Sequence, residues 1–212
     1  MNQTHSPSRD SDYLFKVRID GAPRVGKTAL NERYLDGNFS NGDPRMTFIA
    51  DFRIKTVNFD DKTIKLQLWD RSGAEKYGPI TGFHYRGCCG VLLVYDVTNR
   101  STFEAIENYI PKIQQYATES CITVLCGNKM DLKQERIVSF DEGAQFAEKL
   151  GMPFFEISAK TGSGVYEAFD KLISLMIKTG NGKIEKKEPK DATNIQGLQK
   201  DYCTENKKNS CL

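Results

Sequence analysis

The segment from residue 21 to residue 28 constrains the fold most, because it matches G-x-x-x-x-G-K-T between a predicted strand and a predicted helix. It consists of Gly21, Ala22, Pro23, Arg24, Val25, Gly26, Lys27 and Thr28. In such a loop, backbone N–H groups and the start of the next helix surround phosphate oxygens, and glycine permits their close approach. Lys27 would add positive charge at the outer phosphates, and Thr28 would offer a hydroxyl to Mg²⁺. A chance match in a glycine-containing loop is the alternative, which the flanking strand and helix disfavour.

Strand-like and helical patterns alternate from about residue 13 to residue 178. The strand-like runs cover residues 13–19, 51–59, 64–69, 91–94, 121–126 and 154–157. This order predicts an α/β fold, with a mostly parallel six-stranded sheet and helices on both faces. Residues 51–59 and 63–69, joined by residues 60–62, predict an antiparallel hairpin, so one edge strand should be antiparallel.

Two helical patterns differ in their regularity. One apolar helical face consists of Val165, Phe169, Leu172, Ile173 and Met176. A second pattern, Phe103, Ile106, Ile110 and Ile113, is less clean because Pro111 interrupts it.

Length, charge and cysteine content limit the class of protein. At 212 residues with 39% hydrophobic content, the chain fits one domain plus tails. Thirty basic and 28 acidic residues give a net charge of +2, too balanced to predict nucleic-acid binding. The N-terminus resembles no signal peptide and no apolar run is long enough to span a membrane, so we expect a cytosolic protein. The cysteines lack C-x-x-C spacing, which disfavours a disulfide framework or zinc knot, and Cys121 and Cys126 are expected to be buried thiols.

A second part of the phosphate site is predicted after the strand-like run 64–69. Asp70 ends that run, so its carboxylate should emerge at the same sheet edge as the loop of residues 21–28. An acid there can hold a metal ion directly or through water, and Gly73 could bring its N–H near a terminal phosphate. The alternative is that Asp70 is simply a turn residue.

The residues expected to select the base follow the next two strands. After the run 121–126 come Asn128, Lys129 and Asp131, and the Asp131 carboxylate can accept two hydrogen bonds that guanine offers and adenine does not. Asn128 would bind the other edge and tie neighbouring loops, while the Lys129 stem would lie over the purine. After residues 154–157, the backbone N–H groups of Ser158, Ala159 and Lys160 could bind the guanine carbonyl. A polar turn is the alternative for each segment.

Together these segments resemble the Ras superfamily of small GTPases, and the Rab branch in particular. The resemblance extends over residues 12–178 and includes the stretches 12–16, 65–70, 84–87 and 93–98. It implies a small G domain of the P-loop NTPase class over residues 12–178. Residues 1–11 would be a polar extension, and residues 179–212, with seven lysines and five acidic residues, a disordered tail.

The resemblance also implies roles for residues outside the four motifs. Phe39 looks like the aromatic residue that packs edge-on against guanine, and Thr47 like the switch I threonine that senses the third phosphate through Mg²⁺. Effectors would bind switch I, about residues 43–52, and switch II, about residues 73–83. Loss of the last phosphate would release both loops, under control of an exchange factor and an activating protein.

Several residues depart from the pattern of that family. Pro23 lacks an N–H, and Arg24 would cost on the order of 1 kcal/mol if its backbone needs a positive φ. Switch I is one residue longer than usual, and Ile49 replaces a glycine beside the third phosphate. Ala74 stands where a glutamine orients the attacking water, so we expect slow hydrolysis and a long-lived GTP state. Lys27 and Thr47 would still support the transition state.

The expected function is therefore a Rab-like switch in vesicle traffic, nominally converting GTP and water to GDP and phosphate with Mg²⁺. One alternative is a pseudoGTPase or constitutively GTP-bound scaffold that binds effectors without turnover, which Pro23, Arg24, Ile49 and Ala74 would favour. Another, an ATP-using kinase with the same loop, is disfavoured by Asn128 and Asp131.

The resemblance also implies attachment to the cytosolic face of a membrane, because Rab proteins usually end in one or two prenylated cysteines. The chain ends Asn209-Ser210-Cys211-Leu212, which is not a C-a-a-X box, but an escort protein that recognises the folded body could present Cys211 for prenylation. Lys207 and Lys208 would add on the order of 1 kcal/mol each near anionic lipid, so attachment should be reversible. The alternative is an unmodified thiol.

Overall fold

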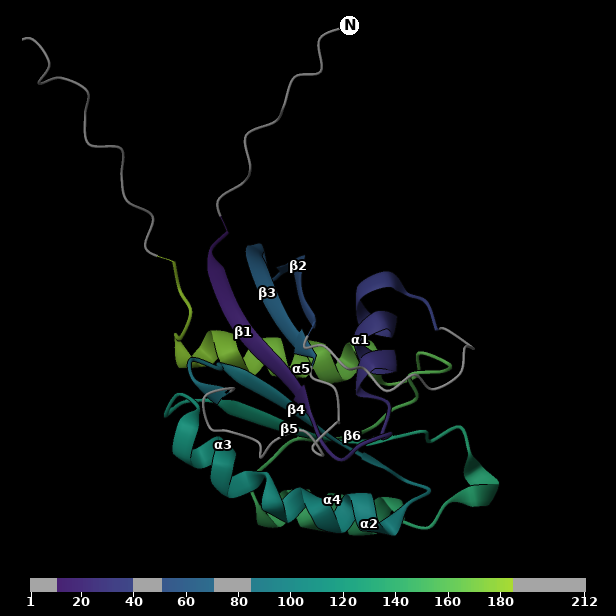
Figure 1. The fold of residues 1–212 in the computed structure, drawn as a ribbon. Coiled ribbons are helices and arrows are strands. Elements are labelled where there is room, and N and C mark those ends of the chain that lie inside the picture. Colours follow the sequence, from purple (N-terminus) through teal and green to yellow (C-terminus); the bar gives the residue numbers. More distant parts are fainter. Residues whose placement is uncertain (1–10, 40–50, 71–84, 185–212) are drawn as a thin grey trace, which may run out of the picture.

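The protein is built on a six-stranded sheet with the order β2-β3-β1-β4-β5-β6 (Figure 1). The computed structural model describes residues 11–39, 51–70 and 85–184. The strands are β1 (Tyr13–Asp20), β2 (Asp51–Phe59), β3 (Lys62–Asp70), β4 (Gly90–Asp96), β5 (Ile122–Asn128) and β6 (Phe154–Glu156). Only β2 runs antiparallel to its neighbour among these strands. The predicted mostly parallel sheet with one antiparallel edge strand is confirmed.

The β2–β3 hairpin closes with a two-residue turn. Phe59 pairs with Lys62, and Asp60 and Asp61 between them have φ values of 45° and 60°. Two consecutive positive φ angles are typical of the turn that matches the right-handed twist of paired strands, and aspartate tolerates this conformation better than most residues. The predicted three-residue connection is therefore one residue shorter in the structure.

Helices cover both faces of the sheet (Figure 1). Their bounds are α1 (Lys27–Asp36), α2 (Arg100–Glu104), α3 (Ile110–Tyr116), α4 (Phe140–Lys149) and α5 (Val165–Thr179), with short 3₁₀ turns η3 (Ala105–Asn108) and η4 (Lys133–Glu135). Leu30 and Tyr34 of α1 join the apolar face of α5 in one core, where the rings of Tyr34 and Phe169 stack with centroids 3.6 Å apart. Ile106, Ile113 and Ala147 belong to a second core on the other face.

Pro111 explains why the helical pattern around residues 103–113 is irregular. It lies in the first turn of α3, where a missing N–H costs no intrahelical hydrogen bond. The segment is consequently divided into α2, η3 and α3 instead of one long helix. Proline thus begins a helix here.

The residues after α5 return to the sheet. Lys183 forms an antiparallel bridge with Tyr13, Leu14 N donates to Gly182 O at 2.8 Å, and Ile184 N donates to Asp12 O at 2.9 Å. These contacts lie at the amino end of β1. In the described ranges no helix has the length and apolar character needed to cross a membrane.

The described cysteines form no disulfide. Cys88, Cys89, Cys121 and Cys126 are all free thiols. Cys126 is fully buried, as expected, whereas Cys121 is half-buried. Burial raises the pKa of the Cys121 thiol to about 12, which keeps it protonated and unreactive near neutral pH.

Candidate functional site

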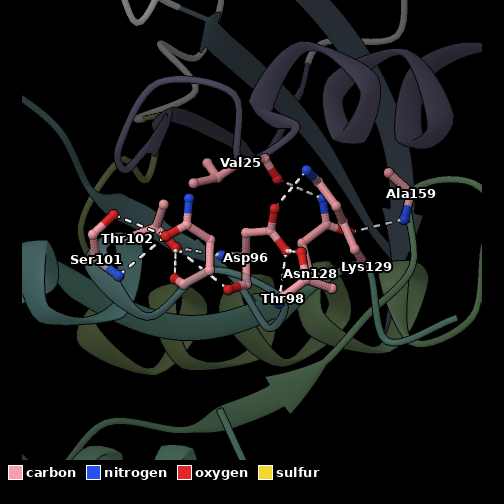
Figure 2. A network of polar contacts seen from close by, with 9 residues as sticks. Val25, Asp96, Thr98, Ser101, Thr102, Asn128, Lys129 and Ala159 are labelled. Carbon is pink, nitrogen blue, oxygen red and sulfur yellow. Dashed lines mark hydrogen bonds and ion pairs between the residues drawn. The ribbon is translucent and has the colours of Figure 1, made fainter. Parts of the chain in front are cut away.

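The loops that carry the predicted site residues meet at the carboxyl edge of the sheet. A single side chain joins three of them, because Asn128 Nδ2 donates to Val25 O at 2.8 Å and Asn128 Oδ1 accepts from Ala159 N at 3.1 Å (Figure 2). Asn128 is 1% exposed. The phosphate loop, the end of β5 and the loop after β6 are therefore held in one arrangement.

Two glycines shape the phosphate loop, residues 21–28. Gly21 has a φ of 139°, and a Cβ atom there would lie 2.0 Å from Val94 O. Gly26 has a φ of 95°, and its Cβ would lie 2.5 Å from Asn128 Nδ2. Any other residue would push the loop away from the adjoining strands at both positions.

Lys27 is folded back over this loop. Its ammonium donates to Gly21 O at 2.7 Å and to Ala22 O at 2.8 Å, and the residue is only 6% exposed. A charge at this depth strengthens its attraction to an anion, since the surroundings screen it less than water would. The arrangement provides a cation and a glycine-lined backbone where phosphate oxygens are expected.

Arg24 has the positive φ that the sequence analysis considered. Its φ is 65°, and both it and the preceding Pro23 are exposed. The left-handed conformation of a residue with a Cβ atom carries a cost of about 1 kcal/mol. The side chain of Arg24 extends into solvent from the outer part of the loop.

Thr28 and Asp70 have the chemistry that Mg²⁺ prefers. Thr28 lies in the first turn of α1, and Asp70 ends β3 beside Ile19 of β1, with only 1% of its surface exposed. Hydroxyl and carboxylate oxygens fit a hard cation, and Mg²⁺ usually takes few protein ligands together with phosphate oxygens and water. No cluster of three or more acidic, histidine or cysteine side chains that could hold a metal by itself occurs among the described residues.

The loop after β5, predicted to select the base, is held by the residues that follow β6. Ser158 Oγ donates to Asp131 Oδ1 at 2.6 Å, and Met130 N donates to Ile157 O at 3.1 Å. These bonds fix the Asp131 carboxylate beside the loop after β6. Lys129 has a φ of 67°, so this loop also contains a left-handed residue.

Asp96 is a site residue that the sequence analysis missed. Its Oδ2 lies 2.5 Å from Lys129 Nζ, while its Oδ1 accepts from the N–H and hydroxyl of Thr98 at 2.9 and 2.7 Å (Figure 2). Asp96 thereby fixes where the Lys129 stem lies at the carboxyl edge. Its signal in the sequence is the same as that of Asp70, an acid directly after an apolar strand.

Arg33 of α1 is the second missed residue. Its guanidinium donates to Ala159 O at 2.8 Å, to Lys160 O at 2.5 Å and to Gly37 O at 2.5 Å. One planar group thus holds the loop after β6 against the end of α1. No local sequence pattern marks this contact, which joins residues 126 and 127 positions apart.

The remaining predicted residues divide into two groups. Phe39 is half-buried and packs against the core between α1 and the sheet. Four others lie outside the described residues: Thr47, Gly73, Ala74 and Cys211. Ile49, most of switch I and all of switch II are outside them too.

Comparison with known proteins agrees with this geometry. The sequence model of the Ras family matches residues 16–178. The chain is 42% identical over 170 residues to Ras-related protein Rab-3 of Caenorhabditis elegans, covering 80% of this chain and 77% of that protein. It is 38% identical over 197 residues to Ras-related protein Rab-3A of Homo sapiens, covering 93% and 89%. It is 40% identical over 191 residues to GTP-binding protein YPT1 of Saccharomyces cerevisiae, covering 88% and 92%.

Proposed function

Because the chain belongs to the Ras family, as a Rab-type small GTPase of vesicle traffic, we propose that it holds a guanine nucleotide with Mg²⁺ at the carboxyl edge of its sheet. The observation that carries this proposal is the Asn128 side chain, which links Val25 of the phosphate loop to Ala159. A linkage of this kind supports the proposal because it would hold a purine site at a fixed distance from a phosphate site.

The phosphate end of the nucleotide would be bound by residues 21–28. Lys27 would neutralise the outer phosphates, and the backbone N–H groups near Gly26 would donate to them. Thr28 and Asp70, together with Thr47, would hold Mg²⁺, which when bound neutralises charge on the phosphates. Gly73 would donate its N–H to the terminal phosphate.

The base end would be bound by the two loops after β5 and β6. Asp131 would accept from the ring N–H and the exocyclic amine of guanine, while the Lys129 stem and Phe39 would contact the ring. Ser158, Ala159 and Lys160 would face the guanine carbonyl. Adenine lacks the two donors that Asp131 requires, so ATP should bind far more weakly.

The nucleotide that the purified protein carries tests this proposal. Denaturation followed by chromatography should release GDP or GTP, and calorimetry with Mg²⁺ should show tight binding of GDP and none of ADP. Release of adenine nucleotide, or absence of heat with both guanine nucleotides, would contradict it.

An Asp131→Asn variant tests the base contact separately. An amide offers one acceptor and one donor, which matches the N–H and carbonyl of xanthine but not the two donors of guanine. The variant should lose GDP affinity and gain affinity for xanthosine diphosphate. Asp141→Asn, on the exposed start of α4, is the matched control and should keep the preference for guanine.

We further propose that hydrolysis is slow because Ala74 replaces the glutamine that orients water. Family membership does not favour the alternative of a pseudoGTPase without turnover. Single-turnover hydrolysis should be faster in Ala74→Gln than in the wild-type chain, whose rate should be at or below the order of 10⁻⁴ per second. Equal rates in the two proteins would refute this part of the proposal.

The proposed partners are effectors at switch I and switch II, an exchange factor, an activating protein, and escort or dissociation-inhibitor proteins. Cys211 is the proposed lipid acceptor, which would place the protein on the cytosolic face of a membrane. Mass spectrometry of the C-terminal peptide from cells should show a prenyl group on Cys211, and a bare thiol throughout would contradict this.

A further inference from the structure

The central strand β1 carries a buried ion pair. It lies between β3 and β4, in a part of the sheet that helices cover on both faces, where parallel strands are usually continuous apolar runs. Arg18 and Asp20 are nevertheless only 3% and 4% exposed. Charged residues at such positions need a structural or functional reason.

The Asp20 carboxylate is fully used by its neighbours. Its Oδ2 accepts from Arg18 Nε at 2.8 Å and from the Tyr85 hydroxyl at 2.5 Å, and its Oδ1 accepts from Gly21 N at 2.9 Å. The Arg18 guanidinium also lies over the ring of Tyr85, 4.9 Å from its centroid. The Asp20 carboxylate therefore connects β1, the first amide of the phosphate loop and Tyr85, which precedes β4.

The protonation states support this arrangement. Burial raises the pKa of Tyr85, and Asp20 raises it further, so the hydroxyl keeps its proton and donates it. Burial alone would lower the pKa of Arg18, but the adjacent Asp20 raises it on balance, so the guanidinium stays charged.

A contribution to folding stability does not by itself explain why Arg18 and Asp20 occupy buried positions. Taking two charges out of water costs several kcal/mol per ion, and well-packed apolar residues of similar volume often serve a core equally well. What the ion pair supplies, and apolar residues would not, is a directed acceptor for the amide of Gly21. The ion pair is therefore better explained by the position that it gives to Gly21 in the phosphate loop.

Both backbone polar groups of Gly21 are held by hydrogen bonds. Gly21 N is bound by Asp20, and Gly21 O accepts from Lys27 Nζ at 2.7 Å. Because Lys27 is the cation of the phosphate loop, a displacement of Gly21 would displace its ammonium as well. Val94 O lies only 2.0 Å from where a Cβ atom of residue 21 would be, so there is little room for such a displacement.

We propose that Asp20, held by Arg18 and the Tyr85 hydroxyl, is a positioning residue that fixes Gly21 and through it Lys27 for nucleotide phosphates. This inference rests on the proposed nucleotide site and assigns to it three residues outside the four motifs. Tyr85, Arg18 and Asp20 touch no nucleotide atom in this scheme. They act through the backbone of Gly21.

A pair of tyrosine variants tests the inference. Tyr85→Phe removes the hydroxyl that donates to Asp20, whereas Tyr95→Phe removes a buried hydroxyl that has no hydrogen-bond partner among the described residues. With a fluorescent methylanthraniloyl GDP bound to the full chain, Tyr85→Phe should speed dissociation about three- to tenfold, as expected for losing part of a charge-assisted hydrogen bond. Tyr95→Phe should leave the rate within about twofold of the wild-type rate.

An NMR signature separates positioning from a general loss of packing. The Gly21 amide proton should resonate downfield in the wild-type chain because it is bound to a carboxylate, and Tyr85→Phe and Asp20→Asn should each move it. Tyr95→Phe should not. Unchanged GDP release and an unmoved Gly21 resonance in Tyr85→Phe would overturn the inference, and so would equal effects in both tyrosine variants.

Failure of the proposed function would look different. In that case the wild-type chain itself would bind no methylanthraniloyl GDP, while the Gly21 resonance would still report whether Asp20 and Tyr85 hold the loop. Movement of this resonance in Tyr85→Phe alone would then support the positioning role.

Discussion

Arg24 has a strained backbone at an exposed point of the phosphate loop. With φ at 65°, its Cβ atom costs energy that glycine would not, and its exposed side chain makes no hydrogen bond or ion pair with the described residues that would compensate. We expect Arg24→Gly to raise the free energy of unfolding by about 0.5 to 1 kcal/mol, the relief being partly offset by the greater freedom of glycine in the unfolded chain. Urea denaturation measures this difference.

Arg24→Ala provides the control for this prediction. It removes the same charge and side-chain length but keeps the Cβ atom, so the strain should remain and stability should change by less than about 0.5 kcal/mol. A gain in Arg24→Ala equal to that in Arg24→Gly would show that charge, and not φ, limits stability.

At the scale of single elements, the Arg33 guanidinium holds the loop after β6 against α1 through its hydrogen bonds. Arg33→Lys keeps the positive charge but cannot bind three carbonyl oxygens in one plane. We expect about tenfold weaker GDP binding by calorimetry, equivalent to about one lost charged hydrogen bond. Arg100→Lys, which alters an ion pair with Glu142 of α4, should leave GDP binding unchanged. Wild-type affinity in Arg33→Lys would show that charge alone suffices.

The start of helix α4 should make the free energy of unfolding depend on pH. Ser139 and Glu142 form a capping box, and Arg100 binds the same carboxylate, so the pKa of Glu142 falls to about 2, mainly through Arg100. Because unfolded glutamate titrates near its ordinary pKa of about 4.3, the unfolded chain takes up this proton first as pH falls. The stabilisation should be complete above about pH 5 and should disappear progressively toward pH 2.

Urea denaturation of Glu142→Gln across this pH range tests the assignment. The stability difference between wild type and variant should be constant from pH 7 to pH 5 and should shrink below it. Glu148→Gln, at an exposed position of α4 without an ion pair in the described part of the chain, should show no such trend. A Glu142→Gln difference that persists unchanged at pH 3 would contradict the prediction.

The sequence predicted the elements better than the contacts between them. Apolar runs such as residues 91–94 identified the strands because buried parallel strands are apolar on both faces, and Pro111 indicated a break in a helix. Arg33 could not be placed, since two of its three acceptors lie more than 120 positions away and the pattern around it is ordinary. Arg18 lies within the predicted strand-like run 13–19 and Asp20 directly after it, but only the fold shows that both side chains are buried.

At the scale of the whole molecule, the last described residues lie at the opposite end of the sheet from the proposed nucleotide site. The proposed nucleotide site lies at the carboxyl ends of the strands, whereas Gly182 and Ile184 bind the amino end of β1. The eight residues of β1 correspond to roughly 25 Å. The chain that would carry the proposed lipid on Cys211 therefore leaves the described domain, after Ile184, at the end of the sheet opposite the proposed nucleotide site.

The contacts that the residues after α5 make with the rest of the domain should stabilise the fold. A chain that ends after Ile184 keeps the hydrogen bonds of Gly182 and Ile184 with β1 and should unfold in urea like the full-length protein. A chain that ends after Thr179 loses both bonds and the contact of Asn181 with Ser120, and should be less stable by about 1 to 3 kcal/mol. If both truncated chains were as stable as the full-length protein, the returning segment would add nothing to the fold, whereas an equal loss in both would place the stabilising contacts beyond residue 184.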